Sequence, residues 1–139
     1  MKRRATKGSL RIRKGTIDDL FHVRVLYGQL SDDTSNIERD YPQILDEPSS
    51  DCLILENESV PIGMIIFHFA TSLSLGRSLE IDEIVIDEHH QGNGFGSYLI
   101  RHCMSIAKDR EMDSIALKCS RTNGRLHGFY EGLGFRHRM

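Results

Sequence analysis

The sequence has no large excess of either charge and no long, uninterrupted hydrophobic run. It has 18 Lys and Arg against 20 Asp and Glu, so the chain as a whole is not attracted to nucleic acid or to anionic membranes. The uncharged stretch Val60–Gly76 is broken by His68, hydroxyl side chains and glycines, and it therefore cannot span a bilayer. We expect neither a dedicated nucleic-acid-binding domain nor a membrane protein.

Cysteine is scarce as well. Cys52, Cys103 and Cys119 are far apart and form no Cys-x-x-Cys pair, which fits a reducing compartment better than a disulfide framework or a zinc site. The basic start Met1–Arg4 is not followed by the apolar run of a secretion signal. We therefore expect a cytoplasmic protein whose cysteines are packing residues.

Neither an internal repeat nor a linker divides the 139 residues. We expect residues 1–8 to form a basic, flexible tail and residues 9–139 to form a single domain. The periodicity of apolar residues predicts the secondary structure. The expected strands are Leu10–Arg13, Cys52–Leu55, Ile62–Ala70, Leu79–Ile86 and Ser114–Cys119, and the expected helices are 17–30, Ile37–Leu45, Gly94–Arg110 and Asn123–Glu131. This order predicts an α/β fold (α+β by some conventions), with helices flanking a mixed, mostly antiparallel sheet that contains one parallel strand-helix-strand unit.

A glycine-rich turn precedes the helix predicted at Gly94. Gly92, Gly94 and Gly96 stand at every second position, which leaves the backbone amides accessible at a helix N-terminus, a common anion-binding arrangement. No Gly-Lys-Ser/Thr follows, and the turn comes after an antiparallel block, so neither a phosphate loop nor a dinucleotide fingerprint fits. Taken alone, the pattern also fits a purely structural turn between a strand and a helix.

The turn Gln91–Gly96 resembles the Gln/Arg-x-x-Gly-x-Gly/Ala signature of the GNAT superfamily of acetyl-CoA-dependent N-acetyltransferases. A second family pattern, an Asn seven residues before a Tyr that leads into Gly-Phe, is met by Asn123 and Tyr130. The likeness also covers the strand Glu80–Ile86. The resemblance implies a GNAT-like fold and one N-acetyltransferase domain, which would move the acetyl group of its cosubstrate acetyl-CoA directly to a primary amine.

The resemblance also implies where the cofactor binds. The backbone of Ile84, Val85 and Ile86 would hydrogen-bond to the pantetheine arm like an added strand. The amides of the turn would hold the pyrophosphate, where the helix dipole adds roughly 0.3 to 2 kcal/mol. Asn123 and Tyr130 would contact the cofactor too, although Asn is also an ordinary helix cap. The turn residues concerned are Gln91, Gly92, Asn93, Gly94, Phe95, Gly96 and Ser97.

Three residues are candidates for the chemistry. Glu80 lies eleven residues before Gln91, like the base of the histone-acetylating branch, whereas Glu83 matches an acidic position of small-molecule branches. We favour Glu80, although strand alternation places the two on opposite faces unless a bulge intervenes. Either carboxylate could also be an ordinary surface group. Tyr130 matches the general acid that protonates the leaving thiolate, while its spacing alone would also fit core packing.

The stretch Ser31–Asp51, which includes the second predicted helix, is acidic. In the family it walls the acceptor side of the cleft, so its negative potential favours a cationic amine, and a small molecule more than a protein. Charge runs are usually only solvated faces, which keeps this preference slight. The acidic residues are Asp32, Asp33, Glu38, Asp40, Asp46, Glu47 and Asp51.

Three further expectations complete the prediction. His89 and His90 diverge on an extended segment without a third ligand, so we expect surface residues and no metal site. Only Arg136–Met139 follow the Gly-Phe pair, so a second copy of the chain could complete an open sheet edge as a homodimer. The alternative to an enzyme is a CoA-binding regulatory or interaction module without turnover.

Overall fold

The computed structural model describes residues 9–117. The predictions for the basic tail 1–8, Cys119, the last helix and the C-terminal sheet edge lie outside these residues. So do the two candidate site residues Asn123 and Tyr130.

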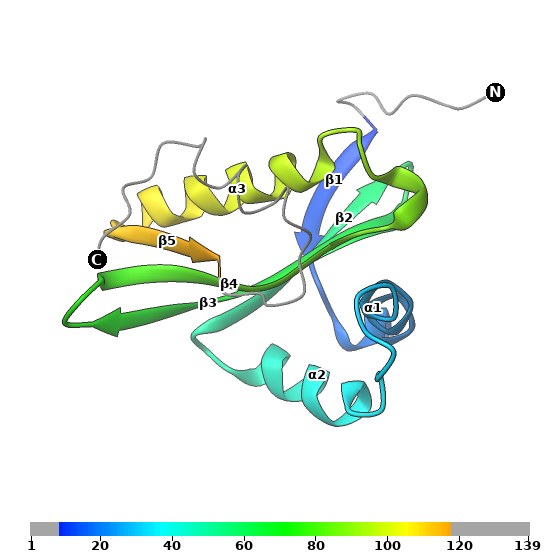
Figure 1. The fold of residues 1–139 in the computed structure, drawn as a ribbon, viewed down its shortest axis with the longest axis horizontal. Coiled ribbons are helices and arrows are strands. Elements are labelled where there is room, and N and C mark those ends of the chain that lie inside the picture. The colour runs from blue at the N-terminus through cyan, green and yellow to red at the C-terminus, as the bar shows by residue number, and fades with distance from the viewer. Residues whose placement is uncertain (1–8, 118–139) are drawn as a thin grey trace.

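Within residues 9–117, five strands form one mixed sheet in the order β1-β2-β3-β4-β5 (Figure 1). Each of the first three strands pairs antiparallel with the next, and β4 pairs parallel with β5. The bounds are β1 (Leu10–Lys14), β2 (Ser50–Asn57), β3 (Val60–Ser72), β4 (Gly76–Ile86) and β5 (Ser114–Leu117). The sheet confirms the predicted fold class.

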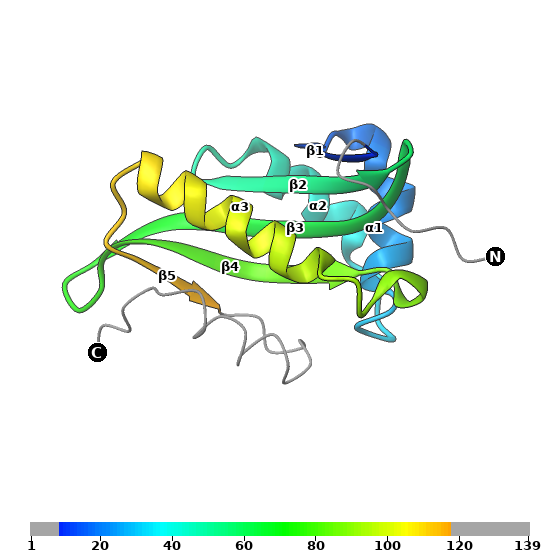
Figure 2. The same cartoon turned by 90° about the horizontal axis from the view of Figure 1, so that it is seen from above.

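Helices cover both faces of the sheet (Figure 2). Helix α3 lies on one face, and α1 and α2 lie on the other. The bounds are α1 (Leu20–Tyr27), α2 (Ile37–Asp46) and α3 (Phe95–Asp109), with short 3-10 turns at η1 (Ile17–Asp19) and η2 (Glu88–His90). The unit β4-α3-β5 is the predicted parallel strand-helix-strand unit. No helix in the described part of the chain is long and apolar enough to cross a membrane.

A separate core lies on each face of the sheet. The predicted stripe of α3 packs against one face, with Phe95, Leu99 and Cys103 buried. On the other face Val23 of α1 and Tyr41 of α2 are buried against β2, β3 and β4. The described cysteines, Cys52 and Cys103, are free and buried in these cores, and burial raises the pKa of each thiol to about 12. Both are packing residues, as predicted.

The strand predicted at Leu79–Ile86 begins earlier in the structure than the sequence indicates. Gly76 to Ser78 already belong to β4, because Ser72 pairs with Gly76 across a tight hairpin. Gly76 has φ +68°, a conformation that glycine adopts without steric cost and that lets the chain turn so closely.

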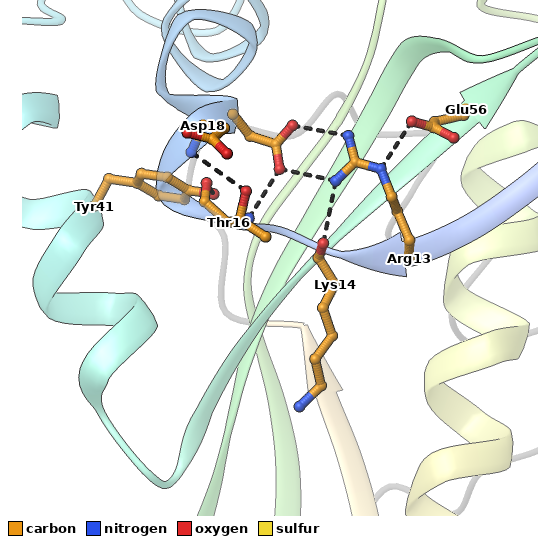
Figure 3. A network of polar contacts seen from close by, with 7 residues as sticks. Arg13, Lys14, Thr16, Asp18, Tyr41 and Glu56 are labelled. Atoms are coloured by element: carbon orange, nitrogen blue, oxygen red, sulfur yellow. Dashed lines mark hydrogen bonds and ion pairs between the residues drawn. The ribbon is translucent and has the colours of Figure 1, made fainter.

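An ion-pair network joins β1 to the start of the first helical segment (Figure 3). Arg13 donates to both carboxylate oxygens of Asp19 at 2.8 Å and to Glu56 at 2.7 Å. Asp19, itself buried, also accepts from the Thr16 amide, while the Thr16 hydroxyl accepts from the amide of Asp18. The hydrogen bonds from Arg13 hold the pKa of Asp19 below its usual value despite the burial that opposes them.

We expect Asp19→Asn to lower the free energy of unfolding at pH 7 by about 2 kcal/mol, because Arg13 loses a charged partner. A carboxyl with a lowered folded-state pKa stabilises the protein above its unfolded value and loses that contribution as the pH falls. The difference from wild type in urea unfolding should therefore shrink below about pH 4. Asp18→Asn, at the exposed neighbouring carboxyl, is the control; an equal effect of both variants would contradict the assignment.

Candidate active site

The glycine-rich turn has a backbone conformation that only glycine adopts easily. Gly92 and Gly94 both have φ +82°, and Gly94 is the N-cap of α3. A Cβ atom at either position would meet nothing within 4 Å. The requirement for glycine is therefore a matter of backbone conformation, and the space in front of the turn is open to a ligand.

The amides of this turn are available as donors. Within the described chain, no hydrogen bond engages the backbone N–H groups from Gln91 to Ser97; the first helical bond joins the Tyr98 amide to the Gly94 carbonyl at 3.0 Å. No side chain caps α3, and its first turn contains no acidic residue. Free donors and the positive end of the helix dipole are together suited to bind a phosphate group.

A contact between distant parts of the chain fixes the position of the turn. Gln29, just beyond α1, donates to Asp87 at 2.9 Å and accepts from the Glu88 amide at 2.8 Å. Burial tends to raise the pKa of Asp87, but hydrogen bonds from Gln29 and His90 outweigh it and lower the pKa. Sequence analysis missed Gln29, because no local pattern signals a contact between residues 58 positions apart.

Strands β4 and β5 pair over only part of β4. Ser78–Ile81 pair with Ser114–Leu117. Ile84, Val85 and Ile86, the predicted pantetheine-binding residues, pair with β3 on one side, and within residues 9–117 no strand pairs with them on the other. This part of β4 therefore leaves an edge to which an extended chain could add as a strand.

A bulge in β4 decides where the two candidate bases point. Ile66 pairs with Glu83, but the next residue of β3 pairs with Ile81, so Asp82 is the extra residue. Ile81 and Ile84 both pack in the α3 core, whereas Val85 packs in the other. Glu80 and Glu83 consequently share the face covered by α1 and α2. The bulge that the sequence analysis made a condition for this arrangement is present.

Glu80 is the centre of a polar cluster on that face. It is 7% exposed and accepts a hydrogen bond from the Ser78 hydroxyl at 2.9 Å. His68 of β3 places Nε2 3.5 Å from Glu80 Oε1, and its Nδ1 lies 2.7 Å from Asp82 Oδ2. Sequence analysis did not identify His68 or Asp82 as site residues, because their contact depends on the pairing of β3 with β4.

Glu83 instead lines a cavity of about 280 Å³ between the sheet and the first two helices. Asp33 and Asp40 of the predicted acidic stretch also line it, and Met64 and Ile66 contribute apolar wall. Other acids of the stretch pair elsewhere, Glu38 with Arg24 and Asp51 with Lys14. Asp40 also pairs with Arg39, so the wall of the cavity carries only part of the predicted charge.

His89 is exposed and His90 contacts Asp87 at 2.8 Å. Across the described residues, no group of three or more His, Cys, Asp or Glu side chains is placed to hold a metal ion.

Comparison with known proteins places this geometry in context. The family model described as acetyltransferase (GNAT) family matches residues 17–135. Thialysine N-epsilon-acetyltransferase of Bos taurus is 26% identical over 95 residues, which span 63% of this chain and 56% of the bovine protein.

Solved structures superpose over nearly the whole chain. A transcriptional regulator from Bacillus halodurans C-125 gives a TM-score of 0.76 at 23% identity, covering 94% of this chain and 96% of that one. An aminoglycoside N-acetyltransferase in complex with CoA gives 0.78 at 18% identity, covering 100% and 93% of the two chains. At these identities the likeness shows a shared fold.

Proposed function

Because the chain belongs to the GNAT acetyltransferase family, we propose that it moves the acetyl group of acetyl-CoA directly to a primary amine. The observation that carries this proposal is the row of amides from Gln91 to Ser97, none of which is hydrogen-bonded to a described residue, beside the edge of β4 that no described strand pairs with. Together they offer donors for a diphosphate and a strand edge for the pantetheine arm. We assign the activity to a single domain over residues 9–139.

The reaction needs a deprotonated amine, a positioned thioester and a proton for the leaving thiolate. The amine nitrogen attacks the thioester carbonyl carbon, and the C–S bond of the resulting intermediate breaks. A carboxylate of β4 takes the proton from the amine, and Tyr130 gives a proton to the thiolate. Direct transfer is supported by the described cysteines, because burial keeps Cys52 and Cys103 protonated and inaccessible as acetyl carriers.

We propose Glu80 as the base and Glu83 as a residue that orients the acceptor. Glu80 lies two residues before the bulge, close to the last residue of β4 that pairs with β5. A pantetheine arm bound along β4 like an added strand would place its thioester near this point. Glu83 lines the neighbouring cavity. Both side chains lie on the face that α1 and α2 cover, so an amine that enters through the cavity would meet Glu83 first and reach Glu80 along the same face of the sheet.

The acceptor proposed here is a small cationic amine. The carboxylates of Asp33 and Asp40 in the cavity wall and the cavity volume of about 280 Å³ support this choice over a folded protein. The bovine relative, a thialysine N-epsilon-acetyltransferase, is compatible with this choice.

A panel of amines tests the proposal against a CoA-binding module without turnover. Purified protein, acetyl-CoA and each amine are mixed, and free thiol is measured. Amine-dependent thiol release supports the transferase, whereas CoA binding without release for any amine supports the module.

The proposal also includes a cytoplasmic location, which the buried free thiols support, and a homodimer, which light scattering would check.

Tyr130→Phe should lower turnover about 100-fold or more, because it removes the proton donor for the thiolate. The Kd of coenzyme A should stay within about threefold, since the phenyl ring keeps its shape. Steady-state kinetics and calorimetry measure the two effects. An equal loss of turnover and of affinity would contradict the role of general acid.

A further inference from the structure

His68 sits between two carboxylates of β4. It pairs with Glu80 across the β3–β4 ladder and lies on the face covered by α1 and α2. Its Nδ1 is 2.7 Å from Asp82 Oδ2, and its Nε2 is 3.5 Å from Glu80 Oε1. On the other neighbouring strand, β2, the residue opposite is Ser50, and Asp51 lies on the opposite face of the sheet. The described ionisable groups that face the imidazole are thus these two carboxylates.

The short contact with Asp82 fixes the tautomer of the ring. An ionised carboxylate can only accept a hydrogen bond, so Nδ1 of His68 must carry the proton at 2.7 Å. In the neutral ring, Nε2 then carries a lone pair, and this nitrogen lies 3.5 Å from Glu80 Oε1. This is the arrangement in which an aspartate orients a histidine to receive a proton on its far nitrogen.

The three side chains also form a gradient of exposure. The exposed fraction of the side chain rises from 10% for Glu80 to 28% for His68 and 36% for Asp82. A base as buried as Glu80 must return each proton it takes from an amine before the next turnover. The two contacts therefore lead from buried Glu80 through the imidazole to Asp82, the most exposed of the three side chains.

We propose that His68, oriented by Asp82, relays protons from Glu80 to solvent and is a positioning residue of the acetyl transfer. The inference rests on the proposed function and on Glu80 as the base. Glu80 first takes a proton from the amine. The carboxylic proton then passes to Nε2 of neutral His68, which becomes an imidazolium, and the Nδ1 proton leaves through Asp82 to water. Return of the proton on Nε2 to Nδ1 through solvent resets the ring. Each turnover releases one proton and changes no oxidation state.

The test compares three variants at saturating acetyl-CoA with an amine that the wild type acetylates. His68→Gln should lower kcat on the order of tenfold to 100-fold, while the KM for acetyl-CoA stays unchanged. His68→Ala should show the same loss, and added imidazole should restore part of kcat by filling the vacated space. His102→Gln, at an exposed position on α3, is the matched control and should behave as wild type.

Several results would overturn the relay. Wild-type kcat in His68→Gln would do so, as would a loss of kcat in His68→Ala that imidazole does not restore, because a purely structural role predicts no rescue. An unchanged kcat in Glu80→Gln would show that Glu80 is not the base whose proton the relay carries away. Failure of the proposed function looks different: the wild type itself then releases no thiol with any amine.

Discussion

Gly94→Ala is expected to weaken the binding of coenzyme A about tenfold or more, with the fold retained. At φ +82° an alanine pays roughly 1 to 2 kcal/mol for the left-handed conformation, so the turn relaxes and its amides lose their common direction. The new methyl group meets nothing within 4 Å in the protein, but it stands in the space where the diphosphate is proposed to bind. Calorimetric titration with coenzyme A measures the change in Kd.

Gly76→Ala is the control that distinguishes the effect of backbone strain on stability from the loss of coenzyme A binding. Gly76 also has a left-handed backbone, with φ +68°, but it lies at the opposite end of β4 from the glycine turn. We expect it to lower the thermal midpoint about as much as Gly94→Ala does, without changing the Kd of coenzyme A. Equal changes in Kd for the two variants would mean that loss of affinity reports general destabilisation, and the phosphate site would lose its support.

Glu80→Gln is expected to lower kcat about 100-fold or more, because an amide cannot accept the proton of the amine. The substitution keeps the shape of the side chain and an oxygen that can accept from Ser78. Glu83→Gln should act mainly on the KM for the amine, since Glu83 lines the cavity. Steady-state kinetics at varied amine concentration distinguishes the two effects.

Glu111→Gln provides the matched control, because this glutamate is exposed beyond the end of α3. It should leave both constants unchanged. If instead Glu83→Gln lowers kcat and Glu80→Gln changes only the KM for the amine, the base is Glu83. The proposed relay through His68 is then wrong as well. If neither variant changes kcat, no carboxylate of β4 is the base.

The features that the sequence predicts well are those that depend on neighbouring residues. The stripe of α3 follows from the spacing of Phe95, Leu99 and Cys103, and the turn before it follows from alternating glycines. Hydrophobic periodicity and glycine conformation act within a few residues, so one sequence suffices to detect them. The predicted helix 17–30 was less exact, since it divides into η1 and a shorter α1.

The features that sequence analysis left open or missed depend on register. Strict alternation puts Glu80 and Glu83 on opposite faces, and only the extra residue Asp82 brings them to one face. A single inserted position changes the hydrophobic pattern of β4 only by placing two polar residues, Asp82 and Glu83, in succession, and such a pair does not by itself locate a bulge. His68 joins the site for the same reason, because its partners are set by the pairing of two strands.

Two-dimensional amide NMR during titration with coenzyme A tests the central claim most directly. The claim is that the free backbone donors of the glycine turn bind the diphosphate. We predict that the amide signals from Gln91 to Ser97 shift most, and that pantetheine, which lacks the diphosphate, leaves them nearly unmoved. Shifts confined to other parts of the chain, or no shifts at millimolar coenzyme A, would contradict it.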